Sequence, residues 1–224
     1  MNNSKISASL MCANLLNLKD DISFLEQASI DFLHLDVMDG TFVPNLTLGI
    51  DTVNRIKEFT NIPLDIHLLI EKPSTIIRSL NFGEGDFVTI HAECSERIME
   101  NVAFIKQKGA LFGLALNPDT TVEEIAKYLP YVDMLNIMLI VPGFAGSTII
   151  HGIMEKVKQT RDFLDSHGYE NVIIEVDGSV NIERAKLLKT YGASMFVGGT
   201  SSIFNKNGSI IENTKALKKA LSDL

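Results

Sequence analysis

The chain has 224 residues, of which 46% are hydrophobic and 21% charged, and its formal net charge is −8 at pH 7. This size suits one domain with a large buried core, and we expect residues 1–224 to form a single domain because no Gly-, Ser- or Pro-rich stretch divides them. The negative charge disfavours nucleic acid as a partner, since binding to a phosphate backbone depends on clustered Lys and Arg.

Nothing in the sequence predicts a membrane-bound or secreted protein. No apolar run reaches the roughly 18 residues of a membrane span, and the segment from Met1 to Lys5 lacks the basic and long apolar parts of a secretory signal. Cys12 and Cys94 are too few for a disulfide framework, and neither has a partner at zinc-finger spacing. We therefore expect a cytoplasmic protein that has no membrane partner.

Eight short apolar segments recur along the chain and are separated by longer amphipathic ones, a pattern typical of repeated β–α units and a parallel sheet. The predicted strands are residues 6–11, 32–37, 64–69, 87–91, 111–116, 134–138, 172–176 and 195–197. Their number and even spacing predict an α/β fold, a single (β/α)8 TIM barrel, rather than an open doubly wound sheet.

The segments between the strands carry features of helices. Pro73 is predicted to open the third helix. Asn181 is expected to cap a helix over residues 182–191, with Gly192 just beyond its end. The last helix is predicted near residues 210–221, on the outer ring of the barrel.

Polar side chains gather at the C-terminal ends of the predicted strands, where barrels of this kind place their chemistry. His34 and Asp36 are two positions apart on one strand, so both point to the same face. With His67 and Asp177 they bring two imidazoles and two carboxylates around one point. That set suits one divalent ion, Zn²⁺, Mn²⁺, Fe²⁺ or Co²⁺, and the ligand types do not choose among these. Either histidine alone is as readily explained as a buried structural residue, but the four together favour a metal centre.

Glycine-rich segments follow the last three predicted strands, and each can present backbone N–H groups to an anion. The candidate phosphate contacts are Gly143, Phe144, Ala145, Gly146, Gly178, Ser179, Gly199 and Thr200. A single glycine after a strand indicates only a turn. Three such segments on adjacent strands favour a phosphate site, because barrels often hold phosphate there.

At these residues the sequence resembles the ribulose-phosphate 3-epimerase family over nearly the whole chain. The resemblance rests on the segments 7–10 (SASL), 34–45 (HLDVMDGTFVPN), 64–68 (LDIHL), 142–146 (PGFAG), 175–179 (EVDGS) and 196–200 (FVGGT). It implies a (β/α)8 barrel of the ribulose-phosphate-binding type. It further implies an isomerase that inverts carbon 3 of a small ketose phosphate, and we expect a homo-oligomer.

Residue by residue, the resemblance implies that His34, Asp36, His67 and Asp177 bind the metal, and that Asp36 and Asp177 also transfer the proton. Inversion needs a base on one face and an acid on the other, with the enediolate between them stabilised by the metal. The remaining substrate contacts implied are Ser9, His67, Met38 and Met138, and for the two methionines a role in the core alone is the alternative.

Asp65, His91 and Glu175 also lie on the predicted strands. Asp65 and Glu175 share the cavity face by parity and can orient the ligands, whereas His91 is expected to be structural.

The expected reaction is D-ribulose 5-phosphate to D-xylulose 5-phosphate, the family's commonest activity. The segments 9–12 (SLMC) and 177–179 (DGS) look more like the branch that converts D-allulose 6-phosphate to D-fructose 6-phosphate, which is the alternative. Val141 stands where the family usually has Asn or Asp, and Ser147 where it usually has Gln. These changes fall in the loop expected to close over the substrate, so they bear on specificity more than on reaction type.

Other functions fit the sequence less well. A metal-free phosphate barrel conflicts with the set of two histidines and two aspartates. A Schiff-base aldolase needs a lysine inside the barrel, yet Lys5 precedes the first strand and Lys72 lies past the third. A non-catalytic sugar-phosphate-binding barrel would require a lost catalytic group, and none is missing.

Overall fold

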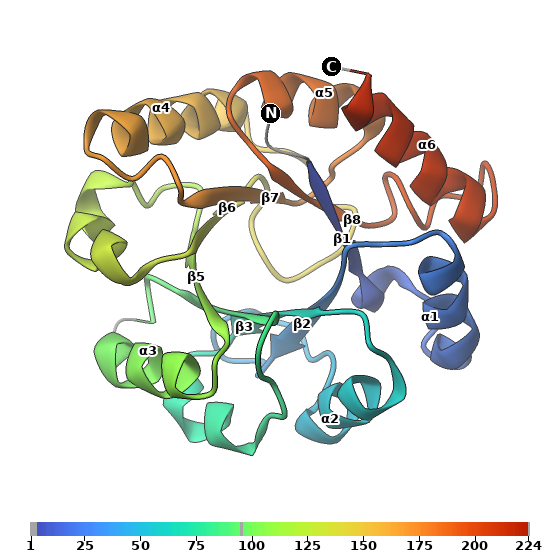
Figure 1. The fold of residues 1–224 in the computed structure, drawn as a ribbon, viewed down its shortest axis with the longest axis horizontal. Coiled ribbons are helices and arrows are strands. Elements are labelled where there is room, and N and C mark those ends of the chain that lie inside the picture. Colours follow the sequence, from blue (N-terminus) through green and yellow to red (C-terminus); the bar gives the residue numbers. More distant parts are fainter. Residues whose placement is uncertain (1–3, 95, 224) are drawn as a thin grey trace.

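Eight parallel strands close into a barrel in the computed structural model, which describes residues 4–94 and 96–223 (Figure 1). The strands are β1 (Lys5–Ser9), β2 (Phe32–Met38), β3 (Leu64–Leu69), β4 (Phe87–His91), β5 (Leu111–Leu116), β6 (Met134–Met138), β7 (Ile173–Asp177) and β8 (Met195–Gly198). Each pairs with the next, and β8 pairs with β1. The predicted (β/α)8 barrel is therefore confirmed.

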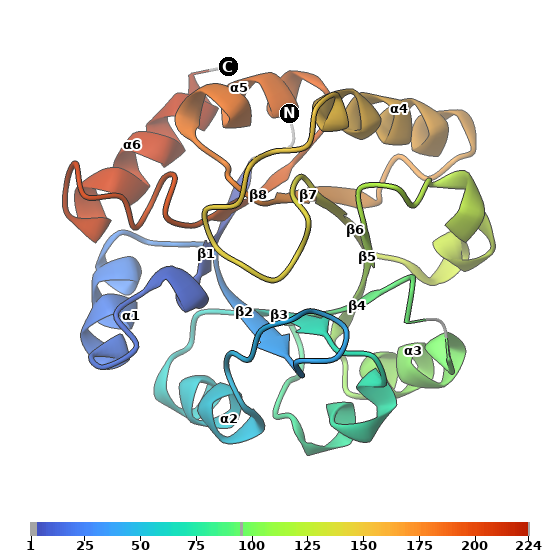
Figure 2. The same ribbon diagram turned by 180° about the vertical axis from the view of Figure 1, so that it is seen from behind.

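Helices surround the barrel on the outside (Figures 1 and 2). The α-helices are α1 (Leu18–Gln27), α2 (Ile50–Phe59), α3 (Ile98–Gln107), α4 (Ile153–Ser166), α5 (Ile182–Thr190) and α6 (Ile210–Ser222). Short 3-10 segments complete the set as η1 (Leu10–Cys12), η2 (Pro73–Thr75), η3 (Ile77–Ser79) and η4 (Glu123–Tyr131). The Asn181 side chain caps α5 by accepting from the Arg184 backbone N–H, as predicted.

Pro73 opens a helix as predicted, but this helix is a short 3-10 segment. The chain forms η2 and η3 there instead of an α-helix. Thr75, Ile76 and Ile77 are β-branched and lose side-chain freedom in an α-helix, and the Thr75 hydroxyl bonds back to the Lys72 carbonyl.

The bounds of β1, β2, β7 and β8 also differ from the prediction, and the larger differences are in β1 and β7. The first strand stops at Ser9 because Leu10 begins η1. The seventh starts one residue later and extends to Asp177, so this carboxylate is the last residue of a barrel strand.

Alternation along the strands divides apolar from polar side chains. On β2, Leu33 and Leu35 join the apolar core, while His34 and Asp36 point to the barrel interior. Phe87, Met134 and Met195, at the starts of β4, β6 and β8, form a separate buried apolar cluster. The polar groups therefore stand on an apolar floor.

The opposite mouth of the barrel is partly covered. Figure 2 shows the segment between β6 and α4 (yellow) crossing in front of the barrel, with the segment between β2 and α2 (blue) beside it. These two segments meet where the Asn45 side-chain amide donates to the Gly143 carbonyl at 2.7 Å.

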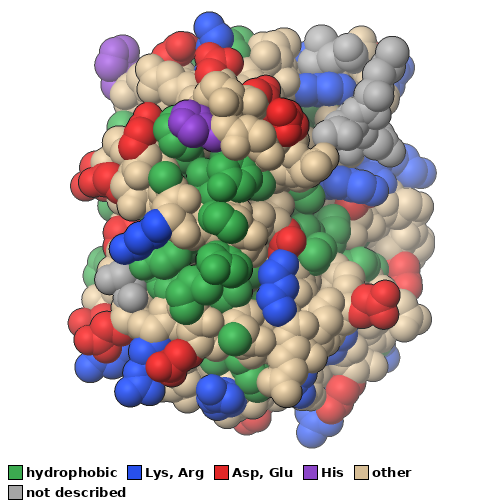
Figure 3. All heavy atoms as spheres, turned by 60° about the vertical axis from the view of Figure 1, so that its left-hand side comes forward, with side chains coloured by type: hydrophobic (Ala, Val, Ile, Leu, Met, Phe, Trp, Pro, Cys, Tyr) green, Lys and Arg blue, Asp and Glu red, His purple; other side chains and the backbone are tan. Residues whose placement is uncertain are grey.

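The outer surface shown in Figure 3 carries acidic and basic side chains interspersed around a central apolar area. Positive charge is thus not gathered into one stripe on this face. No helix within residues 4–94 and 96–223 is long and apolar enough to cross a membrane.

Candidate functional site

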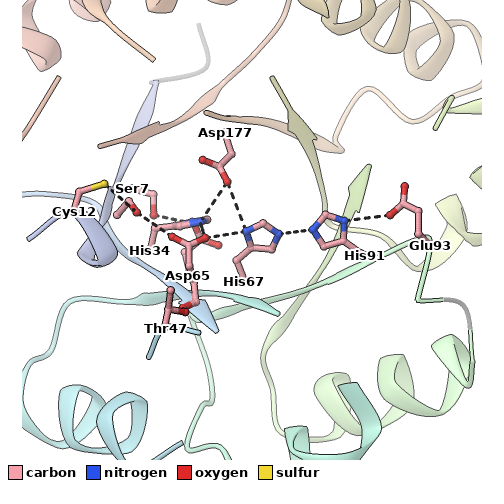
Figure 4. Close-up of polar contacts among 11 residues, drawn as sticks. Ser7, Cys12, His34, Thr47, Asp65, His67, His91, Glu93 and Asp177 are labelled. Carbon is pink, nitrogen blue, oxygen red and sulfur yellow. Dashed lines mark hydrogen bonds and ion pairs between the residues drawn. The ribbon is translucent and has the colours of Figure 1, made fainter. Parts of the chain in front are cut away.

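Four side chains converge at the mouth of the barrel (Figure 4). His34 Nε2 lies 3.1 Å and His67 Nδ1 3.3 Å from Asp36 Oδ1. The same two nitrogens lie 3.7 and 3.6 Å from Asp177 Oδ2. One ligand atom from each residue lies within 4.8 Å of all the others. Two nitrogens and two oxygens therefore face a single point.

Strand register brings these residues together from distant parts of the sequence. Asp36 and His67 are paired across β2 and β3, so they stand at the same height in the barrel. Asp177 is paired with Met138 across β6 and β7. Because all strands are parallel, their C-terminal ends meet at one mouth.

The orientation of His34 is fixed by Asp65, which contacts the ring nitrogen that points away from the cluster. Its Nδ1 lies 2.6 Å from Asp65 Oδ2, and the same oxygen accepts from the Ser7 hydroxyl at 2.8 Å. A carboxylate only accepts, so Nδ1 carries a hydrogen and Nε2 is the nitrogen that faces the cluster. Asp65 thus orients His34, as its position on the strand predicts.

His67 Nδ1 is buried and has no hydrogen-bond partner among the described residues. It points toward the carboxylates of Asp36 and Asp177 at distances longer than a hydrogen bond. A buried nitrogen is rarely left without a partner, and imidazole with carboxylate is the donor set of Zn²⁺, Mn²⁺, Fe²⁺ and Co²⁺ sites. The residues present therefore fit a divalent cation.

The two aspartates of the cluster have pKa values displaced in opposite directions. Burial would raise the pKa of Asp36, but the facing His34 and His67 outweigh it and hold this pKa well below its usual value. Burial raises the pKa of Asp177, and the negative charge of Asp36 adds to the rise while the histidines oppose it. Carboxylates whose surroundings separate their pKa values are suited to different proton-transfer roles.

His34 carries a positive charge readily despite its burial. Desolvation lowers its pKa, but the charges of Asp36 and Asp65 outweigh that effect and hold the pKa well above the ordinary value. Buried Glu175, on β7, has its pKa raised well above normal by burial and by nearby Asp65.

A cavity opens above the cluster. The predicted substrate and phosphate contacts that line it are Ser9, Met38, Met138, Gly143, Phe144, Ala145, Gly146, Gly178, Ser179, Gly199 and Thr200, together with Asp36 and Asp177. His67 is not among the lining residues, because it is fully buried beneath the carboxylates. Met11, Leu69 and Ser201 also line the cavity, and each adjoins a segment that the sequence analysis singles out.

The turn after β7 is tied to the segment that crosses the barrel mouth. Ser179 adopts a positive φ of 51°, unusual for a residue with a side chain. The Ser179 hydroxyl donates to the Ser147 carbonyl at 2.5 Å, and the Arg184 guanidinium donates to the Ser179 carbonyl at 2.6 Å. These two bonds hold the left-handed conformation and fasten the mouth-crossing segment over the cavity.

Comparison with known proteins adds the family. Residues 5–204 match the ribulose-phosphate 3 epimerase family. The ribulose-phosphate 3-epimerase of Bacillus subtilis (strain 168) is 34% identical over 220 residues, covering 98% of this chain and 97% of the relative. The chloroplastic ribulose-5-phosphate-3-epimerase of Arabidopsis thaliana is 35% identical over 217 residues, covering 96% and 77%. Both matches run through the strands that carry the cluster.

Solved structures share the fold at much lower identity. A tryptophan synthase structure from Mycobacterium tuberculosis superimposes with a TM-score of 0.67 at 10% identity, covering 98% of this chain and 93% of the other. Thiamine phosphate pyrophosphorylase from Pyrococcus furiosus gives 0.63 at 9% identity, covering 99% and 97%. At these identities the likeness shows the barrel alone.

Proposed function

Because the chain belongs to the ribulose-phosphate 3 epimerase family, we propose that it is an isomerase that inverts carbon 3 of a ketose phosphate. The observation that carries this proposal is the cluster of two histidines and two aspartates beneath a cavity lined by glycine-rich turns. The proposed substrate is D-ribulose 5-phosphate and the product D-xylulose 5-phosphate, in keeping with the names of the relatives.

His34, Asp36, His67 and Asp177 would hold one divalent ion, Zn²⁺, Mn²⁺, Fe²⁺ or Co²⁺. The fit is supported by the donor set and by the partnerless Nδ1 of His67. When bound, the ion supplies a Lewis acid that stabilises negative charge developing on the substrate oxygens.

Asp36 and Asp177 are the proposed proton-transfer groups. Both reach the cavity, and they come from β2 and β7, so they approach a bound sugar from different sides. One removes the proton from carbon 3 and the other returns a proton to the opposite face, with the roles exchanged in the reverse reaction. Met38 and Met138 line the cavity between them and exclude water from the reacting carbon.

The phosphate is proposed to lie on the turns after β6, β7 and β8, among Gly143, Gly146, Gly178 and Gly199. Gly143, Gly146 and Gly178 have positive φ values, which turn backbone N–H groups away from regular strand pairing. A phosphate at this position leaves the other end of the ketose above the aspartates.

A six-carbon substrate, D-allulose 6-phosphate, is the second candidate. It is favoured by the segments 9–12 and 177–179, whose residues Ser9, Cys12 and Ser179 all line the cavity. The same two aspartates would invert carbon 3 to give D-fructose 6-phosphate.

Isotope exchange tests the reaction and the substrate together. The protein is incubated in heavy water with ribulose 5-phosphate and, separately, with allulose 6-phosphate, and deuterium at carbon 3 is followed by NMR. We expect exchange and epimer formation with ribulose 5-phosphate, and faster exchange with the hexulose would assign the second substrate. Absence of exchange with both, in protein loaded in turn with each of the four ions, would rule out the proposed activity.

The assembly and location of the protein are also proposed. We propose a cytoplasmic homo-oligomer, although one relative is chloroplastic. Light scattering after gel filtration measures the mass, and a monomer at micromolar concentration would contradict the oligomer.

A further inference from the structure

A row of three side chains leads from the cluster toward the surface (Figure 4). His67 Nε2 lies 2.9 Å from His91 Nε2, and His91 Nδ1 lies 3.1 Å from Glu93 Oε2. Both histidine side chains are fully buried, whereas the Glu93 side chain is 24% exposed. His67 Nδ1 faces the cluster, and Nε2, on the other side of the same ring, contacts His91, which in turn contacts Glu93.

Glu93 is held in place by residues that follow β5. Its Oε1 accepts from the Asn117 backbone N–H at 3.0 Å and from the Thr120 hydroxyl. These donors occupy one carboxylate oxygen and leave the other to His91. They and His91 hold the pKa of Glu93 at about 2 against the effect of burial, so the group is a carboxylate at neutral pH.

The positions of the hydrogens follow from what each group can donate. A carboxylate only accepts, so the hydrogen between His91 and Glu93 belongs to His91 Nδ1. In neutral His91 the Nε2 atom is then an acceptor, and the hydrogen in the 2.9 Å contact belongs to His67 Nε2. His67 Nδ1 therefore has a free lone pair, directed at Asp36 and Asp177.

Ring packing keeps the row in line. The planes of the His67 and His91 rings are inclined by only 23°, with centroids 5.0 Å apart, so the two rings meet edge to edge through the Nε2 contact. Phe42, from the segment after β2, lies against His91 with centroids 4.6 Å apart. The ring of His91 is thus held at its two nitrogens by His67 and Glu93 and packed by Phe42.

We propose that His91 and Glu93 are positioning residues that fix His67 in the tautomer with hydrogen on Nε2, so that Nδ1 offers its lone pair to the metal. The inference rests on the metal centre in the proposed function and adds two residues to it. It replaces the expectation that His91 is merely structural. Loss of such a partner typically weakens metal binding about 10- to 100-fold.

Glu93→Gln is the sharpest test, because it should reverse the direction of the hydrogen bonds in the row while the side chains keep nearly the same shape. In this variant the Asn117 N–H and the Thr120 hydroxyl still donate to the side-chain oxygen of Gln. The NH₂ group of Gln therefore faces His91 Nδ1, and this nitrogen has to act as the acceptor. His91 then donates from Nε2, and His67 carries its hydrogen on Nδ1, toward the cluster. Zinc affinity, measured by competition with a chromogenic chelator, is expected to fall about 10- to 100-fold.

Two variants of His91 separate hydrogen bonding from packing. His91→Leu removes the acceptor and should weaken zinc binding by a similar factor, whereas His91→Gln offers an amide oxygen to His67 and should recover part of it. His167→Leu, at an exposed histidine outside the row, is the matched control and should bind zinc as the wild type does. Zinc binding unchanged in both Glu93→Gln and folded His91→Leu would overturn the proposal.

Nitrogen-15 spectra of histidine-labelled protein provide a readout that does not depend on activity. In spectra recorded at alkaline pH, metal-free wild type should carry the His67 hydrogen on Nε2, and Glu93→Gln should carry it on Nδ1. Hydrogen on Nδ1 in the wild type would overturn the positioning role. If the wild type binds no divalent ion, the proposed function fails, and these spectra still decide the tautomer.

Discussion

Asp36 and Asp177 occupy similar positions but receive different hydrogen bonds and charges. The Ser9 hydroxyl donates to Asp36 Oδ2 at 3.0 Å, and both cluster histidines approach its other oxygen. Asp177 lies farther from the same two nitrogens and is more exposed to the cavity. The geometry therefore separates an aspartate that stays ionised from one that retains a proton more easily.

Replacing either aspartate by asparagine should stop epimerisation but leave different residual chemistry. We expect kcat to fall at least about 100-fold in both Asp36→Asn and Asp177→Asn, since each loses a proton-transfer group. The remaining aspartate should still exchange the carbon 3 proton of one epimer with solvent, and the two variants should differ in which epimer exchanges. Deuterium exchange at equal metal content measures this, and unaltered turnover in either variant would contradict its role.

Metal binding should become weaker as the pH falls, and over a range that extends above the ordinary pKa of histidine. Asp36 and Asp65 raise the pKa of His34, so the metal-free cluster retains a proton on this ring at a pH where a free histidine has lost it. A cation must displace that proton, hence affinity rises with pH until His34 is neutral. Calorimetry in buffers of different ionisation enthalpy should detect proton release on zinc binding. Zinc binding with no proton release near neutral pH would contradict this prediction.

At the scale of elements, Gly113 on β5 is paired with Thr89 on the neighbouring parallel strand β4, and the Thr89 side chain occupies the space beside it. A Cβ built on Gly113 would lie 2.9 Å from Thr89 Cβ and 3.1 Å from Thr89 Cγ2. Both residues are buried, and both belong to strands, so neither backbone can move aside cheaply.

Gly113→Ala should therefore lower the free energy of unfolding by about 1–3 kcal/mol through overpacking. Gly83→Ala is the matched control, because a Cβ there meets only the Lys108 carbonyl oxygen, at an ordinary contact distance of 3.8 Å. Its effect should be no more than about 0.5 kcal/mol. Urea denaturation followed by circular dichroism compares the two, and equal stabilities would show that β4 and β5 have room to separate.

The elements also show what the sequence predicts well. The bounds of β3, β4, β5 and β6 match the prediction, because buried parallel strands read as continuous apolar runs. The segment after Pro73 was predicted less well, because its start signal is followed by β-branched residues that favour 3-10 turns.

The cluster was predictable from alternation on single strands, but the row behind it was not. His34 and Asp36 share a face by parity, and strand-end chemistry adds His67 and Asp177. The contact between His67 and His91 depends on ring rotation across two strands, and the anchoring of Glu93 depends on a loop after β5. The spacing of residues along the chain therefore predicts neither the contact between His67 and His91 nor the anchoring of Glu93.

At the scale of the whole molecule, the cluster joins strands from opposite ends of the chain. His34 and Asp36 belong to β2, whereas Asp177 belongs to β7. An ion held between them links the two halves of the closed barrel, and a ligand that binds only the folded state stabilises it.

Loading with metal should therefore raise the melting temperature of the whole barrel. Zinc at about 1,000 times its Kd stabilises the folded state by about 4 kcal/mol, which for a chain of this size raises Tm by roughly 8–16 °C. We expect one unfolding transition, because we propose that residues 1–224 form one domain. Calorimetry with and without chelator tests both points. His67→Ala should lose most of the shift, and identical Tm values for loaded and chelated wild type would contradict the metal centre.

The bond from Ser179 to the segment over the mouth has an evolutionary consequence. It ends on the carbonyl of Ser147, an atom that every amino acid carries, so the fastening is indifferent to which side chain occupies position 147. Val141, in the same segment, is 64% exposed. Mutations can therefore accumulate above the cavity without loosening what holds the loop down. Substitutions in this loop can therefore change the substrate preference while the aspartates that transfer the proton stay the same.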